Sequence, residues 1–525
     1  MRRAGKWAAG ALALGAVGLF SVSGLSVRAA STNVTIRAAG VISPLKASKD
    51  AAHQRYLQQI RARKLAAARA KLAAEHERAQ AVATGIWTRE GKPALLTVIG
   101  PTKVLVVENG TVLQSLRRAK GPLPIGWLAR ELPAQWATYD AATRSARFTS
   151  ALSVTDGCEL EAEPGDVAAV RLGDGAAIWV SRGTFRAGAV AISSYDPQTG
   201  GTLPVTDPAR PFIRAGLGAT LAFDGTVIAA LGNRSAPDES GVTWGKGATG
   251  EASQLVVSGN YTGLRLASSR MVALEDVSVS HSALDGLVLE NDGGTTLSGV
   301  ASTDNGHDGV RLGFGPDRRT LKGVTTSGNQ DYGVVAVALS GLTVLGFTSQ
   351  QDVVGGIRLS RCDRCSVVDP VTSGDRMGVR VDAESHGTSI TGGTISGGDT
   401  GVDAGAAVSL SGTAISGASI GLHAAAGVEV RADRISIRAL RTGAHLEDGG
   451  GLLLSGSTVL APVGIKGRVV YSGHNTVALP PFPWLGIVAI AAIVLGLLLE
   501  TVHALRQAGR ISTRAVAPDH VLNTA

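Results

Sequence analysis

The sequence predicts an all-β protein whose central part is a parallel β-helix solenoid, with a basic helix before it and a transmembrane helix after it. Three observations lead to this fold class: a repeat of 20–24 residues, an alternation of apolar and variable residues inside each repeat, and a composition with 69 glycines and only 4% aromatic residues. A repeat length in the twenties is typical of a solenoid, in which each unit buries its apolar side only by stacking on its neighbours.

Each repeat begins with a glycine, followed by an apolar residue, a variable residue and a small or apolar residue. Because side chains alternate between the two faces of a strand, this pattern predicts a half-buried strand. A second strand-like segment follows in most repeats, so that each coil contains two or three short strands joined by turns. The repeat glycines are Gly263, Gly286, Gly309, Gly333, Gly356, Gly378, Gly401, Gly421, Gly443 and Gly464.

The N-terminal part predicts export and a helix. Residues 1–30 have a basic start, an apolar stretch and small residues before Ala29, which indicates a cleaved signal peptide or, as the alternative, an uncleaved signal anchor. Residues 48–84 contain no Gly or Pro and are rich in Ala, Arg and Lys, which favours an exposed basic helix. We interpret this helix as a solvated spacer; binding to anionic lipid or wall polymers is the alternative.

Strand-like segments with dense turns fill residues 85–250, and the repeats cover 251–475. We expect the first of these regions to be β-rich and to cap the solenoid, because an uncapped coil would expose its apolar interior and its strand edges.

The C-terminal part predicts a membrane anchor. A proline-rich neck at 480–483 precedes an apolar segment at 484–502, which is close to the roughly 20 residues that span a bilayer. Arginines follow in the tail at 503–525, and by the positive-inside rule they place the C-terminus in the cytoplasm. We therefore expect a single-pass protein of the cell membrane with the β-helix outside.

Charge and cysteine content exclude some classes of function. The net charge is +8, but eight basic and three acidic residues between Lys49 and Arg78 supply a local +5, so the charge does not indicate a nucleic-acid partner. Three cysteines in 525 residues exclude a disulfide scaffold. For Cys362 and Cys365 we expect a local disulfide in preference to a redox or metal site, with Cys158 left over.

The variable residue of each repeat points outward, and equivalent residues on successive coils lie about 4.8 Å apart. These residues form a row, which we call the outward ladder, and four of its first six members are arginines. Guanidinium groups pair bidentately with carboxylate or sulfate, so the ladder is a candidate track for an anionic polysaccharide; arginines that only promote solubility are the alternative. The ladder consists of Arg265, Val288, Arg311, Val335, Arg358, Arg380, Asp403, His423, His445 and Lys466.

Further polar residues stand at the turn before these strands. Asp285 and Asp308 hold the same register on adjacent coils. Two carboxylates so close to each other either share a proton or bind a cation such as Ca²⁺. His307 and Tyr332 suit proton abstraction and return at the carbon next to a uronate carboxylate. Plain turns are the alternative, since Asn, Asp and Gly are what such bends need. The turn residues are Asp285, His307, Asp308, Asp331, Tyr332, Asp375 and Arg376, of which Asp331 and Arg376 join the ladder arginines as candidate substrate-binding residues.

The glycine-led units, with Asn or Asp shortly before the glycine, resemble the right-handed parallel β-helix repeats of the pectate-lyase-like superfamily. This superfamily includes pectate lyases, polygalacturonases and mannuronan C5-epimerases, besides non-enzymatic members, and the resemblance covers about residues 250–470. The epimerases carry an Asp-Pro-His-Asp type of motif, whereas here His307 and Asp308 follow Asn305-Gly306. The resemblance implies a polysaccharide C5-epimerase or lyase with an incomplete motif.

We therefore expect a membrane-anchored, outward-facing protein that binds an anionic polysaccharide and modifies it. In this hypothesis His307 and Tyr332 form the acid/base pair, Arg311 and Arg358 neutralise the substrate carboxylate, and Asp308 orients the site or binds a cation, with Ca²⁺ as the one candidate cofactor. A non-catalytic cell-surface scaffold or adhesin is the alternative, because a solenoid fold by itself does not determine a reaction.

Overall fold

The computed structural model describes residues 58–70, 493–505 and 95–479, the last range without 110, 217, 316 and 317. The chain divides into two compact units, Met1–Glu75 and His76–Ala525. In the first unit, residues 58–70 form an exposed helix. The predicted signal segment, the proline-rich neck and most of the predicted cytoplasmic tail lie outside the described residues.

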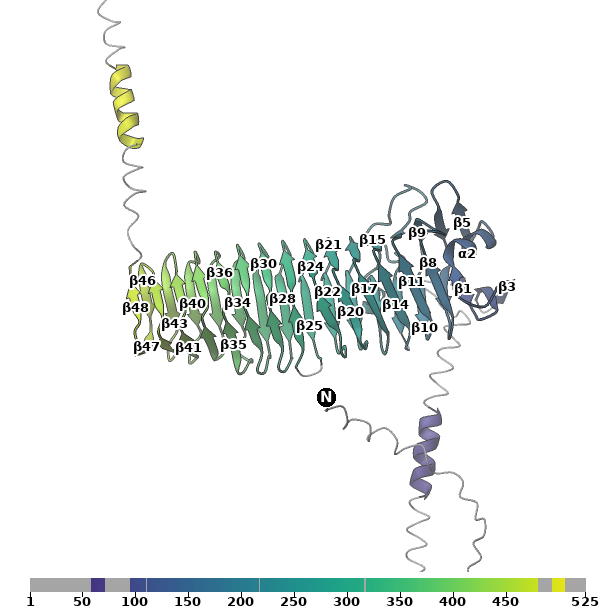
Figure 1. The fold of residues 1–525 in the computed structure, drawn as a ribbon, viewed down its shortest axis with the longest axis horizontal. Helices are drawn as coiled ribbons and strands as arrows, with labels where there is room; N and C mark the ends of the chain where they lie inside the picture. Colours follow the sequence, from purple (N-terminus) through teal and green to yellow (C-terminus); the bar gives the residue numbers. More distant parts are fainter. Residues whose placement is uncertain are drawn as a thin grey trace, which may run out of the picture. The chain divides into compact units, whose positions relative to one another are not determined.

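The second unit contains a solenoid of about 14 turns, which Figure 1 shows as a stack of thin coils. One coil consists of β19 (Leu264–Ala267), β20 (Val272–Glu275) and β21 (Ser278–Ser280). Each strand pairs in parallel with its equivalent in the next coil, as Leu264 does with Leu287 of β22 (Leu287–Glu290). The predicted parallel β-helix is thus confirmed.

The coils form parallel sheets on three faces. The first sheet carries the outward ladder and contains β7 (Ala151–Val154), β10 (Ile178–Ser181), β13 (Ile213–Gly216), β16 (Val242–Trp244), β19, β22, β25 (Val310–Gly313), β28 (Tyr332–Val337), β31 (Gly355–Ser360), β34 (Met377–Val381), β37 (Thr400–Ala404), β40 (Ile420–Ala424), β43 (Thr442–Leu446) and β46 (Val463–Lys466). A 16-stranded sheet from β5 (Ala137–Asp140) to β48 (Thr476–Ala478) forms the second face. The third face is divided into a 7-stranded sheet that ends at β23 (Thr296–Ser298) and an 8-stranded sheet that starts at β26 (Thr320–Lys322).

Inward side chains stack into continuous apolar rows. Leu264, Leu287 and Val310 follow repeat glycines on three successive coils, and each is completely buried. At the N-terminal end, the Phe223 ring makes edge contacts with Phe185 and Trp244, with centroids 6.0 and 5.7 Å apart. Each coil therefore shields the apolar side of the coil below it, which is the main stabilising contribution in a solenoid.

The repeat glycines are required by the close approach of neighbouring coils. A Cβ at Gly286 would lie 2.7 Å from the carbonyl oxygen of Gly309, and a Cβ at Gly309 would lie 2.7 Å from that of Gly333. Any larger residue would push these coils apart. The glycine that identifies each repeat in the sequence therefore sets the distance between neighbouring coils at the corner just before the strands of the first sheet.

A row of polar side chains is buried at the same corner. Oδ1 of Asn329 accepts hydrogen bonds from the backbone N and the side-chain Nδ2 of Asn305, at 3.1 and 2.8 Å. Asp352 and Asp375 continue the row, with Oδ1 of Asp375 2.8 Å from the backbone N of Asp352. Because unpaired backbone amides are costly to bury, this row stabilises the corners of successive coils.

The N-terminal end of the solenoid is covered by α2 (Ile125–Glu131) and an antiparallel meander. Ile125 and Leu128 of α2 are completely buried. The meander contains β1 (Leu95–Ile99), β2 (Lys103–Glu108) and β3 (Thr111–Arg117), and β1 also pairs in parallel with β7. Parallel pairing between strands of the second face begins with β6 (Ser145–Phe148), which pairs with β9 (Ala169–Leu172).

The three cysteines are free and buried. Cys362 and Cys365 belong to the hydrophobic core of the solenoid, at 1% exposure each. The expected local disulfide between them is therefore not formed, and these thiols act as small apolar core residues.

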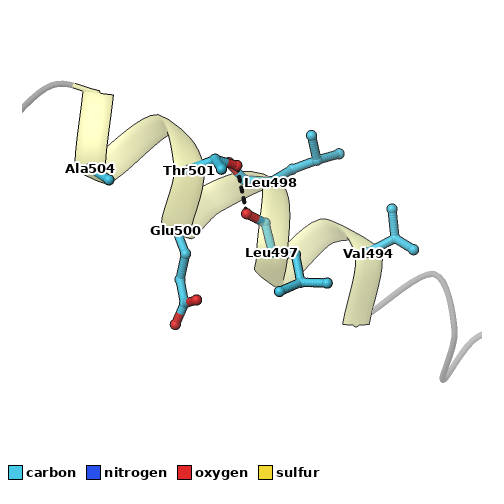
Figure 2. Close-up of a pocket in the computed structure, with 6 residues that line it drawn as sticks. All are labelled: Val494, Leu497, Leu498, Glu500, Thr501 and Ala504. Atoms are coloured by element: carbon cyan, nitrogen blue, oxygen red, sulfur yellow. Dashed lines mark hydrogen bonds between the residues drawn. The ribbon is translucent and has the colours of Figure 1, made fainter.

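Figure 2 shows Val494, Leu497 and Leu498 on the helix at residues 493–505, with Glu500 pointing away from Leu498. The Thr501 hydroxyl donates to the Leu497 carbonyl at 2.6 Å. No helix in the described part of the chain is long and apolar enough to cross a membrane.

On the described residues, the predicted transmembrane helix at 484–502 is therefore wrong. The same finding contradicts the predicted single-pass location in the cell membrane, which depended on that helix.

Candidate functional site

The strand register places all ten residues of the outward ladder in one row on the first sheet. Arg265 pairs with Val288, Val288 with Arg311, and Arg311 with Val335. The row continues from Val335 through Arg358 and Arg380 to Lys466. The sequence spacing alone was sufficient to predict this row, because one glycine marks each coil.

Most ladder arginines are paired with acidic side chains. Arg358 and Arg380 share Asp382, each at 2.9 Å, and Nη2 of Arg265 lies 2.6 Å from Oε2 of Glu290. These carboxylates also point outward, two residues after a ladder position, and the sequence reasoning missed them. The ladder is therefore a row of ion pairs with exposed guanidinium groups, and an incoming anion competes with internal partners for them.

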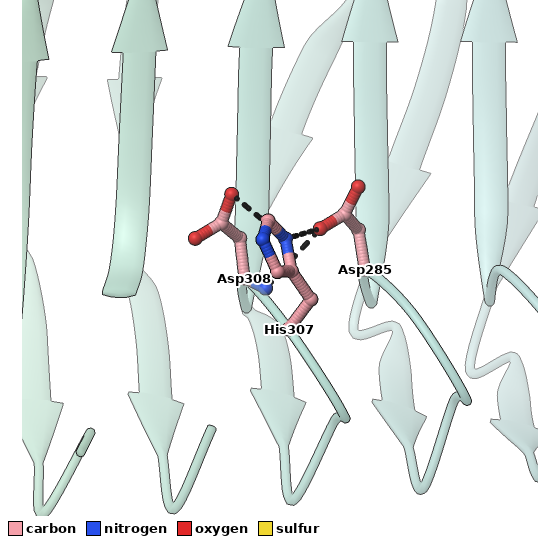
Figure 3. Close-up of side chains that lie close together, drawn as sticks. All are labelled: Asp285, His307 and Asp308. Atoms are coloured by element: carbon pink, nitrogen blue, oxygen red, sulfur yellow. Dashed lines mark hydrogen bonds and ion pairs between the residues drawn. The ribbon is translucent and has the colours of Figure 1, made fainter. Parts of the chain in front are cut away.

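His307 lies at the centre of an acidic cluster (Figure 3). Its Nδ1 is 2.6 Å from Oδ1 of Asp285 and 3.3 Å from Oδ2 of Asp308, and its Nε2 is 3.4 Å from Oδ2 of Asp331. Asp285 and Asp308 occupy the turn before β22 and β25, so the stacking of two coils brings them together. Figure 3 shows the imidazole between the two carboxylates.

Asp308 is the buried member of this cluster, with its side chain 1% exposed. Its Oδ1 accepts a hydrogen bond from the backbone N of Tyr332 at 3.3 Å, and its Oδ2 lies 3.6 Å from Nη1 of Arg311. Burial and the neighbouring charge of Asp285 raise the pKa of Asp308 to about 7. A carboxyl with this pKa can both hold and release a proton at neutral pH.

The imidazole of His307 is more basic than usual. Partial burial acts to lower its pKa, but the hydrogen bond to Asp285 and the charges of Asp308, Asp285 and Asp331 raise the pKa overall. The ring is also accessible, with 42% of the side chain exposed. Because Nδ1 faces Asp285, we assign the proton of the neutral imidazole to Nδ1. Nε2 is then the nitrogen that exchanges protons with a substrate.

Tyr332 is placed between the His307 cluster and the later arginines. Its ring is buried at 3% exposure and lies under Arg358, whose guanidinium carbon is 5.8 Å from the ring centroid. Burial raises the pKa of the Tyr332 hydroxyl, while the charges of Arg380 and Arg358 and a hydrogen bond with Arg380 oppose this shift. The phenol therefore stays protonated at neutral pH.

Two other turn residues lie away from this cluster. Arg376 is exposed and forms a surface ion pair with Asp399 at 2.9 Å. Asp375 is 1% exposed and belongs to the buried corner row. The structure thus brings His307, Asp285, Asp308, Asp331 and Arg311 together and leaves Arg376 apart.

One donor atom each from Asp285, His307 and Asp308 lies within 4.8 Å of the others, so these three side chains could hold a metal ion. Calcium prefers six to eight oxygen ligands. These three side chains offer two carboxylates and one imidazole, and the Asp331 carboxylate lies on the Nε2 side of the imidazole. Oδ2 of Asp308 already lies 3.6 Å from Nη1 of Arg311. The predicted pair of calcium ligands, Asp285 and Asp308, is therefore a poor fit to that ion.

A pocket of about 320 Å³ adjoins the cluster. Residues 233–240, including Pro237 of η1 (Pro237–Glu239), form one wall of the pocket. Arg265 and Arg311 of the first sheet and Asp285 of the turn before β22 also contribute to its lining. The sequence reasoning missed this wall. Its signal was the connection from Ala229 to Val242, which is longer than the equivalent connections of the coils that follow and contains Pro237.

Comparison with known proteins supports the architecture. Residues 240–395 match the family model described as "Right handed beta helix region", which gives the coils their hand. No curated protein matches the chain.

Several solved structures are similar. The periplasmic alginate epimerase AlgG is 12% identical, with 69% of this chain and 84% of that chain covered and a TM-score of 0.46. The A-module of mannuronan C-5 epimerase AlgE6 from Azotobacter vinelandii is 17% identical, with 64% and 89% covered and a TM-score of 0.39. The catalytic unit of a GH87 alpha-1,3-glucanase from Streptomyces thermodiastaticus is 14% identical, with 64% and 63% covered and a TM-score of 0.35. With TM-scores below 0.5, these likenesses say nothing about the side chains at the site.

Proposed function

We propose that this right-handed parallel β-helix protein binds an anionic polysaccharide along the outward ladder and transfers protons at the carbon next to a uronate carboxylate. The observation that carries the proposal is the exposed His307 imidazole, held by Asp285 at 2.6 Å on the same face as Arg311, Arg358 and Arg380. A base beside cations is what removal of a proton next to a carboxylate requires, because the cations stabilise the negative charge that develops on the carboxylate.

In the proposed reaction, Nε2 of His307 takes the proton from the substrate carbon. The electron pair of the broken C–H bond moves into the carboxylate, whose added charge Arg311 and Arg358 neutralise. Return of a proton to the opposite face of the carbon completes an epimerisation. If instead the electron pair expels the neighbouring glycosidic oxygen, which leaves with a proton, a carbon–carbon double bond forms and the polymer is cleaved.

Tyr332 is the proposed proton donor of both outcomes, since its phenol stays protonated at neutral pH. Tyr332 belongs to β28, two coils beyond β22, which Asp285 precedes, and the Arg358 guanidinium lies over its ring. Asp308 is proposed as a positioning residue, because it contacts both His307 and Arg311.

The second candidate function is a non-catalytic scaffold that presents the long ladder face. It is favoured by one observation: Arg358 and Arg380 are both engaged with Asp382, and Arg380 also lies 3.8 Å from Asp403, so that two carboxylates balance the two guanidinium groups without a ligand.

The test is incubation of the protein in D₂O with a panel of uronate polysaccharides. Proton NMR reports deuterium at the carbon next to the carboxylate, and ultraviolet absorbance reports unsaturated products. We expect exchange that falls by about 10² or more in His307→Gln and Tyr332→Phe, and that persists in His386→Gln, an exposed histidine outside the outward ladder. Binding without exchange on every polymer would instead support the scaffold, and new reducing ends without unsaturation would indicate hydrolysis by the carboxylates.

A further inference from the structure

The connection between β15 (Val227–Ala229) and β16 crosses the outer face of the first sheet. Asp238 of η1 lies between two arginines of the row, with Oδ2 2.7 Å from Nη2 of Arg214 and Oδ1 3.9 Å from Nε of Arg265. Thr243 pairs with both arginines in the strand register and is completely buried. The outer face of the first sheet is therefore covered at this coil.

Beyond Arg265 the same face is open. The side chains of Arg311, Arg358 and Arg380 are 42, 40 and 40% exposed, against 19% for Arg265. A polymer that lies along the ladder can continue over these later coils. It cannot continue past η1, because Asp238 and its two arginine partners occupy that position.

The 320 Å³ pocket lies where the open face meets this wall. Its volume is at the lower end of the range for small-ligand sites, and three arginines, Arg234, Arg265 and Arg311, contribute to its lining. Arg265 and Arg311 have carboxylate partners, whereas Arg234 is exposed on the wall itself. A pocket of this size with a surplus guanidinium suits one anionic sugar residue.

The pocket also reaches the proposed site, since Asp285 and Arg311 belong to both. His307 precedes β25, one coil beyond Asp285, which is a distance of about 4.8 Å along the solenoid. A sugar held in the pocket therefore places the next residue of its chain over His307.

We propose that this pocket is a terminal subsite, which holds the end residue of an anionic polysaccharide, so that the protein engages chain ends and not internal segments. The inference rests on the proposed function for the identity of the ligand. It adds that the protein acts at chain ends, because the wall formed by residues 233–240 determines where the end of the bound polymer lies.

The test measures binding of oligouronates of increasing length to the protein by calorimetry. If ends are bound, the Kd per mole of chain becomes independent of length once the subsites are filled. If chains bind laterally, longer chains offer more overlapping sites and the Kd per mole of chain keeps falling. The variant Arg234→Ala should weaken binding of a tetramer by about tenfold, the effect of losing one charge-assisted hydrogen bond.

The matched control is Arg361→Ala, which removes another exposed arginine, 52% exposed and 3.9 Å from its partner Glu384; it should leave the Kd unchanged. A Kd that falls steadily with length and is indifferent to Arg234→Ala would overturn the terminal subsite, while deuterium exchange at the His307 site would still stand. A third result is also informative: the Kd is independent of chain length and depends on Arg234, but no polymer exchanges deuterium. This result would support the terminal subsite and contradict the proposed reaction.

Discussion

The ring of Tyr332 fills the space beside Gly355 on the next coil. A Cβ on Gly355 would lie 2.7 Å from Cε1 of Tyr332 and 2.7 Å from the carbonyl oxygen of Met377. The two residues are directly paired in the register of β28 and β31. The glycine is therefore needed for Tyr332 to adopt its buried position between the His307 cluster and the later arginines.

We predict that Gly355→Ala lowers the free energy of unfolding by about 1–3 kcal/mol through overpacking, and that it reduces proton exchange by displacing Tyr332. The midpoint of urea unfolding measures the first effect. The control is Gly216→Ala at the end of β13, where a Cβ meets nothing within 4 Å. In a Tyr332→Ala background the cost of Gly355→Ala should be smaller; an equal cost in both backgrounds would show that the tyrosine ring is not the obstacle.

The basicity of His307 predicts the pH dependence of the reaction. The proposed base is the neutral imidazole, and the surrounding carboxylates raise its pKa. We therefore expect kcat/KM to rise with pH through this raised pKa and to level off above it.

Removal of the Asp285 charge tests this assignment. A negative neighbour stabilises the imidazolium, so Asp285→Asn should lower the pKa of His307 and move the acidic limb of the profile to lower pH. The variant keeps an oxygen that can accept the Nδ1 proton. A limb that stays in place or moves to higher pH would contradict the assignment of His307 as the base.

The sequence was sufficient to predict the solenoid and the ladder because both depend on a local, repeated constraint. A glycine that cannot be replaced without pushing coils apart appears once per turn, as at Gly309, and it fixes the register of every strand that follows. Once the register is known, the proximity of Asp285 and Asp308 follows from counting residues.

The sequence could not predict which of several nearby residues each side chain pairs with. Asp382 accepts two arginines from the row, one of them Arg358 from the preceding coil, and this choice depends on side-chain conformation. The wall that carries Asp238 folds back across a sheet from a connection without repeats. The apolar character of residues 484–502 suggested a bilayer span, whereas no helix among the described residues is long and apolar enough for one.

The environment of Asp308 predicts that the site works without calcium. Its Oδ2 lies 3.6 Å from the Arg311 guanidinium, which repels a cation, and Oδ1 of Asp285 already accepts from Asp308 N and contacts His307. We expect EDTA or added Ca²⁺ to change the exchange rate by less than about twofold, since the oxygen ligands that calcium requires are too few.

The complementary variant is Arg311→Gln, which removes the repelling charge and should tighten binding of Mn²⁺ at the cluster, as measured by paramagnetic broadening of His307 resonances. Loss of activity in EDTA that Ca²⁺ restores would show that a metal ion belongs to the site.

The buried corner row predicts how the stability of the solenoid depends on pH. Burial raises the pKa of Asp375 to about 7, although hydrogen bonds from Ser349 and the backbone N of Asp352 oppose the shift. Between the ordinary pKa of 3.8 and this raised value, the folded state holds a proton that the unfolded state releases. The free energy of unfolding should therefore fall as pH rises from about 4 to 7 and level off above that.

Asp375→Asn removes this titration and keeps an oxygen that can accept the 2.8 Å hydrogen bond from Asp352 N, as Asn329 does for Asn305. We expect the variant to be more stable than the parent at pH 8 by on the order of 2 kcal/mol and to lose part of the slope below pH 7. Urea unfolding at several pH values measures both. The exposed Asp399→Asn serves as control and should keep the parental slope; an unchanged slope in Asp375→Asn would mean that Asp375 is ionised in the folded corner.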